Sequence, residues 1–326
     1  MADILLVSLG STAGLRAADA ELAASLRRAG ADVAEVAVEL PSERRTFALH
    51  DLAQARAARR AARAALAEHG RAPLLYSSST AALLWPAPGA VRFDAPAAGN
   101  RPGRHGLWQR PLERRRLATA PLLVPWSAGG LAEAPTPRAD AMVVPVPVEP
   151  SEGPAPARDL AAVAYGADAP KKGLDRILRA WSRARRAGEE LVVAGTDAPV
   201  NGEGVTSAGL VSPSEFRALL RRARAYVAAP RREDYGIAQL EALAEGAVLV
   251  TTPAPGPYAA LPIACELDPR LVSDDLAGAL RAALDDPPPG YAEAAAEALA
   301  PYRRAAVDRI VADELLPRLL ATRDQT

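Results

Sequence analysis

The sequence predicts an α/β protein with two doubly wound domains, each built on a parallel sheet. Short apolar runs alternate with longer Ala- and Leu-rich segments of helical spacing, which is typical of parallel strands joined by helices. Residues 145–156 contain five prolines in twelve positions, which no helix or central strand tolerates, so we interpret this segment as an inter-domain linker. The alternation starts again after it, and a length of 326 residues suits two domains.

The first domain is expected to begin with a strand over residues 4–9, a loop over 10–14 and a helix over 15–29. A second helix is expected at about residues 52–69. A glycine follows each of these helices, as at many helix ends. Further short strands are predicted at 33–38, 73–77, 91–93, 121–124 and 142–144.

The second half of the chain repeats this rhythm. Strands are predicted at 160–165, 191–194, 205–210, 226–229 and 248–251, and helices at 174–187, 213–222, 233–245 and 274–284. The sequence Asp-Asp-Pro-Pro-Pro-Gly at 285–290 then breaks the chain before two closing Ala/Leu-rich helices. We therefore expect domains at 1–148 and 149–300, followed by a closing segment at 301–326.

Composition excludes several classes of function. Lys and Arg total 39, as do Asp and Glu, and the resulting net charge of zero argues against a nucleic-acid partner. Cys265 is the single cysteine, so the chain has no disulfide framework or thiolate metal cluster, and its apolar neighbours predict a buried thiol. The first residues lack the basic start of a signal peptide and no apolar run is long enough to span a bilayer, so we expect a cytoplasmic protein.

The most informative stretch runs from Glu233 to Gly246. A short buried-strand pattern precedes Glu233 and a helical pattern follows it, so Glu233 is expected in a strand-to-helix loop and Glu241 about two helical turns further on. Such a loop offers backbone N–H groups and a helix N-terminus to an anionic ligand. Since a carboxylate would repel a phosphate, sugar hydroxyls are the better ligands for these glutamates. Solvated surface charges are the competing interpretation for either glutamate alone.

The segment Pro230-Arg-Arg-Glu-Asp-Tyr-Gly-Ile237, with Glu241 and Gly246 after it, resembles the E-x7-E signature of retaining glycosyltransferases with the GT-B fold. The resemblance is to glycosyltransferase family 4 in particular, the glycosyl transferases group 1. The strand patterns before this segment are similar in spacing as well, and the match covers roughly residues 160–285.

A second part of the resemblance lies at Tyr165-Gly166-x4-Lys171-Lys172-Gly173, which looks like the segment whose lysine neutralises the donor's diphosphate in this family. These are the only two lysines in the chain; the other 37 of its 39 basic residues are arginines. Lysine retained at one place suggests a compact charge directed at a phosphate, although a chance pair on a surface turn is the alternative. Ala167 stands where the family usually has an arginine, so either the lysines act alone or Arg231 or Arg232 assists.

The resemblance implies a role for each matching position. Glu241 would bind the ribose hydroxyls of a nucleotide, and Glu233 would contact sugar hydroxyls near the reacting carbon. Lys171 and Lys172 would stabilise the leaving diphosphate. The remaining donor-binding positions would be Tyr235, Gly236, Ile237, Gly166 and Gly195. The implied reaction retains the anomeric configuration without a protein nucleophile, a metal or a cofactor.

The first domain offers weaker candidates. Residues 10–14 lie where a strand meets a helix, and Thr12 and Gly14 could let the backbone approach the diphosphate, although a plain tight turn explains them equally well. The loop after the strand at 91–93 carries Asp94 and His105, either of which could position or deprotonate an acceptor hydroxyl. Ordinary loop residues are the alternative. Possible acceptor-binding residues in the same loop are Asn100, Arg101 and Arg104.

Arginines recur at positions 56, 59, 60 and 63 of one expected helix and at 114–116. A solvated face explains them, and a surface docking on anionic lipid is the sharper alternative.

These observations predict a metal-independent, retaining glycosyltransferase with two Rossmann-like domains facing a cleft and C-terminal helices that cross back to the first domain. The first domain would bind a hydroxyl acceptor (a glycan, a glycolipid or a small molecule, including lipid-linked ones), and the second a nucleotide-sugar donor. Membrane contact would be at most peripheral, on the inner face. Two alternatives are a non-catalytic GT-B protein that binds a sugar nucleotide or acts as a scaffold, to which Ala167 gives weight, and a nucleotide-dependent oxidoreductase, against which the absent G-x-G-x-x-G pattern counts.

Overall fold

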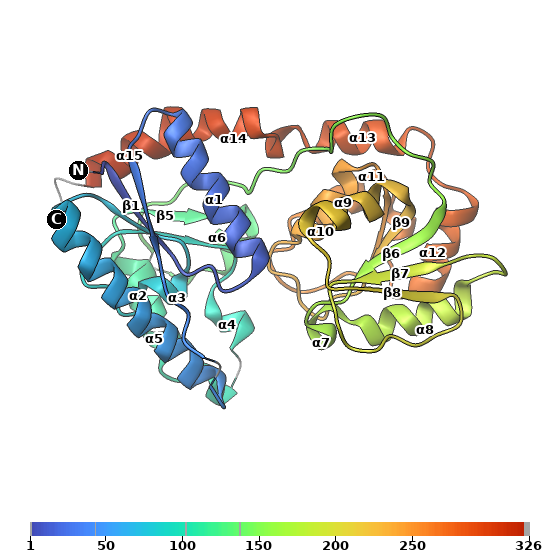
Figure 1. Cartoon of the computed structure of the whole chain (residues 1–326), viewed down its shortest axis with the longest axis horizontal. Coiled ribbons are helices and arrows are strands. Elements are labelled where there is room, and N and C mark those ends of the chain that lie inside the picture. Colours follow the sequence, from blue (N-terminus) through green and yellow to red (C-terminus); the bar gives the residue numbers. More distant parts are fainter. Residues whose placement is uncertain (1, 43, 102, 137, 323–326) are drawn as a thin grey trace. The chain divides into compact units, whose positions relative to one another are not determined.

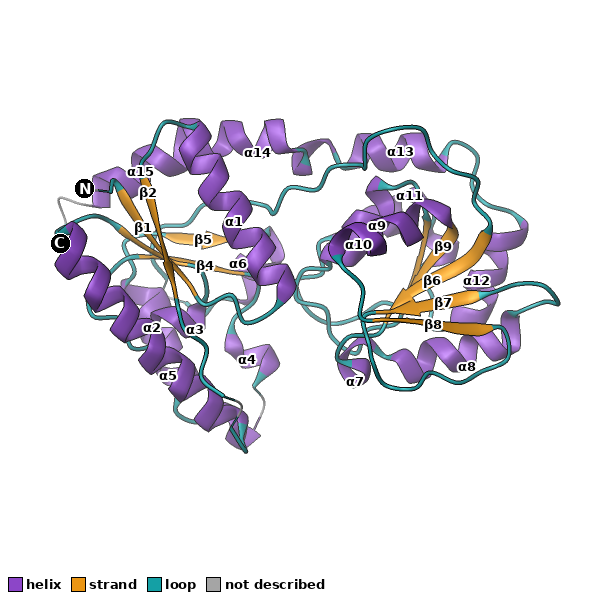
Figure 2. Cartoon of the chain, in the orientation of Figure 1, coloured by secondary structure: helices purple, strands orange, loops and turns teal. Residues whose placement is uncertain are grey.

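The computed structural model describes residues 2–42, 44–101, 103–136 and 138–322. The chain divides into two compact units, one formed by Met1–Pro147 with Arg304–Thr326 and the other by Val148–Arg303. Figure 1 follows the chain from blue to red, and Figure 2 shows that each unit holds one sheet between helices. Both sheets have five strands, and every paired strand in them is parallel.

The sheet of the first unit has the strand order β2-β1-β3-β4-β5. Its strands are β1 (Ile4–Ser8), β2 (Val33–Ala37), β3 (Leu74–Tyr76), β4 (Ala90–Phe93) and β5 (Leu123–Pro125). Successive side chains of β1 point to opposite faces, so Leu5 and Val7 belong to one core cluster and Ile4 and Leu6 to another. The helices of this part are α1 (Ala13–Arg28), α2 (Phe47–His69), α3 (Ser79–Ala82), α4 (Ala97–Asn100), α5 (Gln109–Thr119) and α6 (Ala128–Glu133).

The sheet of the second unit has the strand order β10-β9-β6-β7-β8. Its strands are β6 (Leu160–Tyr165), β7 (Leu191–Ala194), β8 (Val205–Gly209), β9 (Ala223–Ala228) and β10 (Val248–Thr251). The helices are α7 (Ala169–Lys172), α8 (Leu174–Ala184), α9 (Pro213–Arg222), α10 (Ile237–Ala244), α11 (Ala260–Leu267), α12 (Leu276–Asp285) and α13 (Tyr291–Ala298). Because β6 lies between β7 and β9, its carboxyl end is the point where the strand order reverses, which is where open α/β sheets bind ligands.

The last helices of the chain pack on the first unit. They comprise α14 (Arg304–Ile310), a π-helical turn (Val311–Leu315) and α15 (Leu316–Ala321). Their side chains Val307, Val311, Leu315 and Leu319 are buried in the same cluster as Ile4 and Leu6 of β1. Asp308 accepts hydrogen bonds from Ser25 and Arg28 of α1 at 2.5 and 2.8 Å. The contact therefore combines an apolar stripe with an ion pair.

Two expectations from the sequence were wrong. Residues 142–144 form no strand: Met142 and Val144 donate to Leu123 and Pro125 of β5 at 2.9 and 3.0 Å, with one isolated bridge at Ala141. The two prolines that follow lack backbone N–H groups, so the pairing cannot continue. Cys265, expected to be buried, is exposed on α11.

Several helix bounds also differ from the expected ones. The second helix begins at Phe47 rather than near residue 52, because Thr46 caps it by accepting from the Leu49 N–H. The first helix begins at Ala13, so Gly14 lies inside it and not in the preceding loop. Among the residues that the structure describes, no helix is long and apolar enough to cross a membrane.

Candidate functional site

The Glu233–Lys171 region lies at the carboxyl ends of β6 and β9, which are neighbours in the second sheet. The segment after β6 carries both lysines, and the segment after β9 carries Glu233. A backbone hydrogen bond from the Arg231 N–H to the Lys171 carbonyl, 2.9 Å long, joins the two segments. Gly173 allows this contact: its φ is +67°, and a Cβ there would lie 1.9 Å from the Ala229 carbonyl oxygen.

Each lysine forms an ion pair with a buried carboxylate of the opposite segment. Lys171 Nζ lies 2.5 Å from Asp234 Oδ2, and Lys172 Nζ lies 2.7 Å from Glu233 Oε2. Each carboxylate has a second donor, since Arg232 Nε donates to Asp234 Oδ1 at 2.9 Å and Gln239 Nε2 donates to Glu233 Oε2 at 3.0 Å. The structure thus brings together Lys171, Lys172 and Glu233, which the sequence predicted as functional, and adds Asp234 and Gln239.

Glu241 lies on α10, two turns beyond this cluster, and keeps 23% of its side chain exposed. Arg217 of α9 approaches it at 3.6 Å but is held more closely by Glu245, at 2.6 Å. Burial raises the pKa of Glu241, and Arg217 partly offsets this effect. Burial raises the pKa of the phenol of Tyr165, the last residue of β6, and the charge of Glu241 adds to this effect. Glu233 and Glu241 therefore flank one end of the sheet.

The other predicted donor-binding residues frame the same end of the sheet. Gly166 and Gly195 follow β6 and β7 directly, and the Gly166 N–H donates to the Ala194 carbonyl at 2.7 Å. Tyr235 is buried, and Gly236 adopts a φ of +89° where a Cβ would lie 2.9 Å from the Tyr258 ring. Helix α10 then begins at Ile237 with no side-chain cap, which leaves its first N–H groups available to an anionic ligand.

The possible arginine helpers are differently placed. Arg231 is exposed and pairs with Asp175 of α8 at 2.9 Å, whereas Arg232 is half-buried on Asp234. Arg232 therefore belongs to the lysine–carboxylate cluster, and Arg231 is held against α8.

In the first unit, Thr12 accepts a hydrogen bond from the Leu15 N–H and so caps α1. Gly10, with a φ of +54°, makes the preceding turn, and its carbonyl accepts from Arg16 at 2.9 Å. Both observations describe a capped strand-to-helix turn. The proposed contact of Thr12 and Gly14 with a diphosphate remains a prediction.

Asp94 and His105 lie in different surroundings. Asp94 directly follows β4, where one of its carboxylate oxygens accepts from the Ala95 N–H at 2.7 Å. His105 is exposed in the 3-10 turn Gly103–Gly106 and meets the ring of Phe47 edge-on, with 5.6 Å between ring centroids. Asp94 is thus placed at the carboxyl end of the first sheet, and His105 near the start of α2.

The three predicted acceptor-binding residues also differ. Arg101 binds the buried Asp51 of α2 through two hydrogen bonds of 2.8 and 3.1 Å and lies over the Phe47 ring. Asn100 ends α4, and Arg104 is exposed. Arg101 therefore has a structural contact that the sequence did not suggest, while Arg104 is free to reach solvent.

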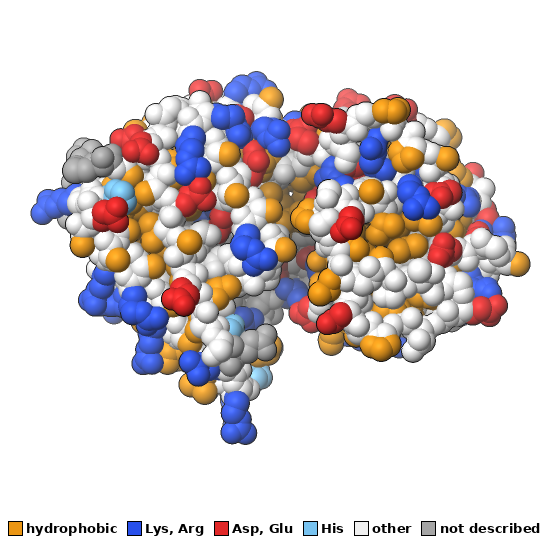
Figure 3. All heavy atoms as spheres, viewed as in Figure 1, with side chains coloured by type: hydrophobic (Ala, Val, Ile, Leu, Met, Phe, Trp, Pro, Cys, Tyr) orange, Lys and Arg blue, Asp and Glu red, His pale blue; other side chains and the backbone are white. Residues whose placement is uncertain are grey.

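Several exposed arginines lie along α2. Arg56, Arg60 and Arg63 are exposed on it, whereas Arg59 donates to the Leu84 carbonyl at 2.8 Å. In Figure 3, blue side chains line the edge of the first unit over this helix; they are arginines, because both lysines of the chain lie in the second unit. Arg56, Arg60 and Arg63 thus form an exposed basic face, and docking of this face on anionic lipid stays a prediction.

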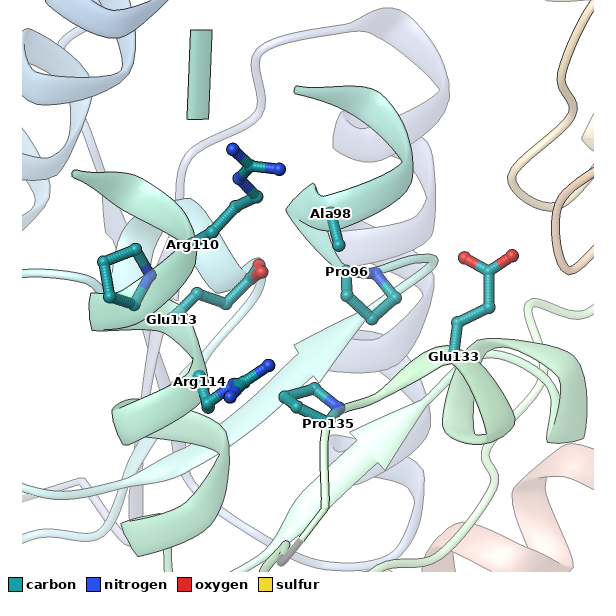
Figure 4. Close-up of a pocket in the computed structure, with 8 residues that line it drawn as sticks. Pro96, Ala98, Arg110, Glu113, Arg114, Glu133 and Pro135 are labelled. Atoms are coloured by element: carbon teal, nitrogen blue, oxygen red, sulfur yellow. The ribbon is translucent and has the colours of Figure 1, made fainter. Parts of the chain in front are cut away.

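A separate hollow of about 550 Å³ lies within the first unit, lined by Pro96, Ala98, Arg110, Pro111, Glu113, Arg114, Glu133 and Pro135. Figure 4 shows Glu113 and Arg114 extending from α5 toward Pro96 and Pro135. Glu113 is only 3% exposed, and both its carboxylate oxygens accept from the Ala97 N–H at 3.0 and 2.9 Å. Glu113 therefore fixes the backbone at Ala97, three residues after Asp94.

Burial raises the pKa of Glu113 from 4.5 to about 7, although Ser79 and the Ala97 N–H act in the opposite direction. The folded protein holds this proton up to about pH 7, whereas the unfolded chain releases it near 4.5, so stability should fall as pH rises through this window. Glu113→Gln should reduce that fall by about 3 kcal/mol, because an amide does not ionise. Urea unfolding of both proteins at pH 4.5 and above pH 7 measures the difference. Parallel pH profiles would contradict this prediction.

The sequence did not reveal three residues of the second-unit site. Asp234 stood inside the quoted motif, but only the fold shows that it faces Lys171. Neither Gln239 nor Arg217 is one of the defining residues of a sequence motif. Arg217 lies on α9 and approaches Glu241 only because α9 packs against α10. The alternation of strands and helices could place these elements in the right order but could not reveal which side chains meet.

The chain is similar to known proteins in sequence and in fold. Residues 159–299 match the model of the family described as Glycosyl transferases group 1. No curated protein sequence matches this chain significantly. A solved sucrose-phosphate synthase from Thermosynechococcus elongatus has a TM-score of 0.76 at 16% identity, covering 98% of this chain and 99% of its own.

Two further structures are similar over nearly their whole length. WaaG, a glycosyltransferase involved in lipopolysaccharide biosynthesis, has a TM-score of 0.67 at 16% identity, covering 99% of this chain and 98% of its own. HepE of Anabaena, solved in complex with UDP and glucose, has a TM-score of 0.64 at 13% identity, covering 96% and 98%. At such identities the likeness establishes the fold, which is GT-B: two parallel five-stranded sheets with flanking helices.

Proposed function

We propose that this chain, whose residues 159–299 match the model of the glycosyl transferases group 1, moves a sugar from a nucleotide-sugar donor to an acceptor hydroxyl with retention of configuration and without a metal ion. The second unit would bind the donor and the first unit the acceptor. One observation carries the proposal: both lysines of the chain meet both acids of the Glu233–Asp234 pair where the second sheet reverses its strand order.

The charges at this place suit the departure of a nucleoside diphosphate. When the bond between the anomeric carbon and the phosphate oxygen breaks, negative charge develops on the diphosphate. Lys171, Lys172 and the uncapped N-terminus of α10 would stabilise that charge. These groups would supply the positive charge that a metal ion provides in other enzymes. Among the residues that the structure describes, no three His, Cys, Asp or Glu side chains are grouped to hold such an ion, and the independence from a metal stays a prediction.

The two glutamates would recognise sugars. Glu241, half-buried beside Tyr165, would accept hydrogen bonds from the ribose hydroxyls. Glu233 would accept from hydroxyls of the transferred sugar and favour positive charge developing at its anomeric carbon. On the acceptor side, Asp94 or His105 would position the attacking hydroxyl. As the new glycosidic bond forms and the bond to the diphosphate breaks, the hydroxyl proton would pass to that side chain or to the departing phosphate oxygen.

Peripheral contact with a membrane is a further part of the proposal. The large apolar side chains Phe47, Leu49 and Leu107 are 58%, 54% and 65% exposed. Leu107 is close to the start of α2 in space, because neighbouring Trp108 donates to the Ala48 carbonyl at 3.1 Å. Apolar side chains beside the arginines of α2 suit an anionic lipid surface and a lipid-linked acceptor. Sedimentation with vesicles that contain anionic lipid would test this, and equal recovery with neutral vesicles would count against it.

A panel of UDP-, GDP- and ADP-sugars tests the proposed function. We expect one nucleotide to raise the melting temperature and its sugar to be released or transferred, because ligands that bind only the folded state stabilise it. UDP is a first choice because HepE and a pneumococcal O-GlcNAc transferase of similar fold were solved with it. Binding without transfer or hydrolysis would favour the non-catalytic alternative. Stabilisation by NAD or NADP alone would contradict donor binding and favour the oxidoreductase.

A further inference from the structure

Both candidate phosphate-binding lysines are already neutralised by acids in this structure. The side chains of Asp234 and Glu233 are only 8% and 5% exposed, whereas those of Lys171 and Lys172 are 35% and 24% exposed. The acids are therefore buried, and the lysine side chains are the more exposed partners in both ion pairs. A bound diphosphate would have to compete with these carboxylates for the lysines.

The second donors on the acids make such competition feasible. Arg232 donates to Asp234 Oδ1 at 2.9 Å and Gln239 donates to Glu233 Oε2 at 3.0 Å, and neither hydrogen bond involves a lysine. A buried carboxylate that loses every partner is costly, but here each would keep one. The backbone of the lysine segment is held independently by the Arg231–Lys171 hydrogen bond and the close packing at Gly173. Only the lysine side chains need to move.

We propose that Lys171 and Lys172 move from the carboxylates of Asp234 and Glu233 to the phosphate oxygens when the donor binds. Asp234 is then an internal competitor for Lys171 that limits the affinity of the protein for diphosphates. This inference rests on the proposed donor site. Its consequence for Glu233 is different from that for Asp234. Once Lys172 leaves, Glu233 Oε2 can accept from a sugar hydroxyl, so the exchange couples phosphate binding to recognition of the sugar.

The same exchange explains how the product would leave. After the sugar is transferred, Glu233 loses its hydroxyl partner while a negative diphosphate remains near it. Return of Lys172 to Glu233 and of Lys171 to Asp234 restores both ion pairs and weakens the hold on the diphosphate. The intact nucleotide sugar is thereby favoured over the nucleoside diphosphate.

Asp234→Asn tests the competitor role of Asp234. Asparagine keeps the shape and an oxygen that accepts from Arg232, but it no longer attracts Lys171 as an ion. We expect calorimetry to show about tenfold tighter binding of whichever of UDP, GDP and ADP binds the wild type, and of inorganic pyrophosphate. Binding of the matching nucleoside, which lacks phosphate, should not change. A purely structural role of Asp234 would not separate these ligands.

Two further variants make the test specific. In Asp234→Asn/Lys171→Met the gain should disappear, because the released lysine is absent. Asp175→Asn is the matched control, since Asp175 is a carboxylate of the same unit that pairs with Arg231 and Arg179 rather than with a lysine. A gain of the same size in Asp175→Asn, or one that persists without Lys171, would overturn the exchange. So would unchanged affinity in Asp234→Asn.

Pyrophosphate keeps this result separate from the proposed function. If no nucleotide binds the wild type but Asp234→Asn binds pyrophosphate more tightly, the competition is upheld and the donor assignment fails. If a nucleotide binds the wild type and Asp234→Asn binds it and pyrophosphate no better, the donor assignment stands and the exchange is wrong. Failure of every ligand to bind either protein would overturn both.

Discussion

Replacing Lys171 and Lys172 together with alanine is expected to weaken the binding of a nucleoside diphosphate by about a hundredfold or more, because each lysine would make a charge-assisted hydrogen bond to it. The loss should appear with nucleotide sugars as well. It should be much smaller with the nucleoside alone, which lacks the phosphates. Calorimetric titration of both proteins with the nucleotide that stabilises the wild type measures the effect.

The double variant also removes partners from two buried acids, so its stability has to be measured alongside. Arg232 and Gln239 remain on Asp234 and Glu233, and we therefore expect the fold to survive. Arg179→Ala/Arg183→Ala is the matched control, since it takes the same charge from exposed positions of α8 in the same unit. Equal losses in the two double variants would show a general charge effect. An undiminished affinity in the lysine variant would refute the phosphate role.

Replacing Glu233 with glutamine is expected to lower kcat by about a hundredfold while changing the donor KM much less. Glutamine keeps the size of the side chain and can still bind a hydroxyl, but it lacks the negative charge that favours a developing positive charge at the anomeric carbon. Gln239 already donates to Oε2 of Glu233, so in Glu233→Gln the new side-chain amide would lie beside the amide of Gln239. Steady-state rates with the donor identified by the nucleotide-sugar panel give both constants.

Glu266→Gln provides the control for this experiment. Glu266 is an exposed glutamate of α11 in the same unit, and its replacement changes the net charge equally. Its kcat should match that of the wild type. If Glu233→Gln retained full turnover, Glu233 would have no role near the reacting carbon.

Most strands of the two sheets could be predicted because they are short apolar runs between clear breaks, as at β1, β6 and β10. The strand expected at 142–144 had the same apolar signal, but the prolines beyond it end the pairing with β5. Helix α5 was missed because its arginines and its charged start conceal the apolar stripe: only Gln109, Glu113 and Leu117 of its residues are buried. A search for regularly spaced apolar residues does not detect a buried glutamate such as Glu113.

The candidate site was partly predictable for a related reason. The spacing of Glu233 and Glu241 follows from one strand and one helix that are adjacent in sequence, so local patterns placed both residues. The meeting of Lys171 with Asp234 depends on the packing of β6 against β9, which are separated by two further strands along the chain. In the first unit, Arg101 could be named as a ligand-binding residue, but its pairing with Asp51, fifty positions away, could not be foreseen.

The central claim is that the second unit binds a nucleotide sugar at the ends of β6 and β9. A crystal structure of the protein soaked with the nucleotide sugar that stabilises it most tests this directly. We predict that the diphosphate lies within hydrogen-bonding distance of Lys171 and Lys172 and that the ribose hydroxyls meet Glu241. A nucleotide bound elsewhere, with both lysines still paired to Asp234 and Glu233, would contradict the claim.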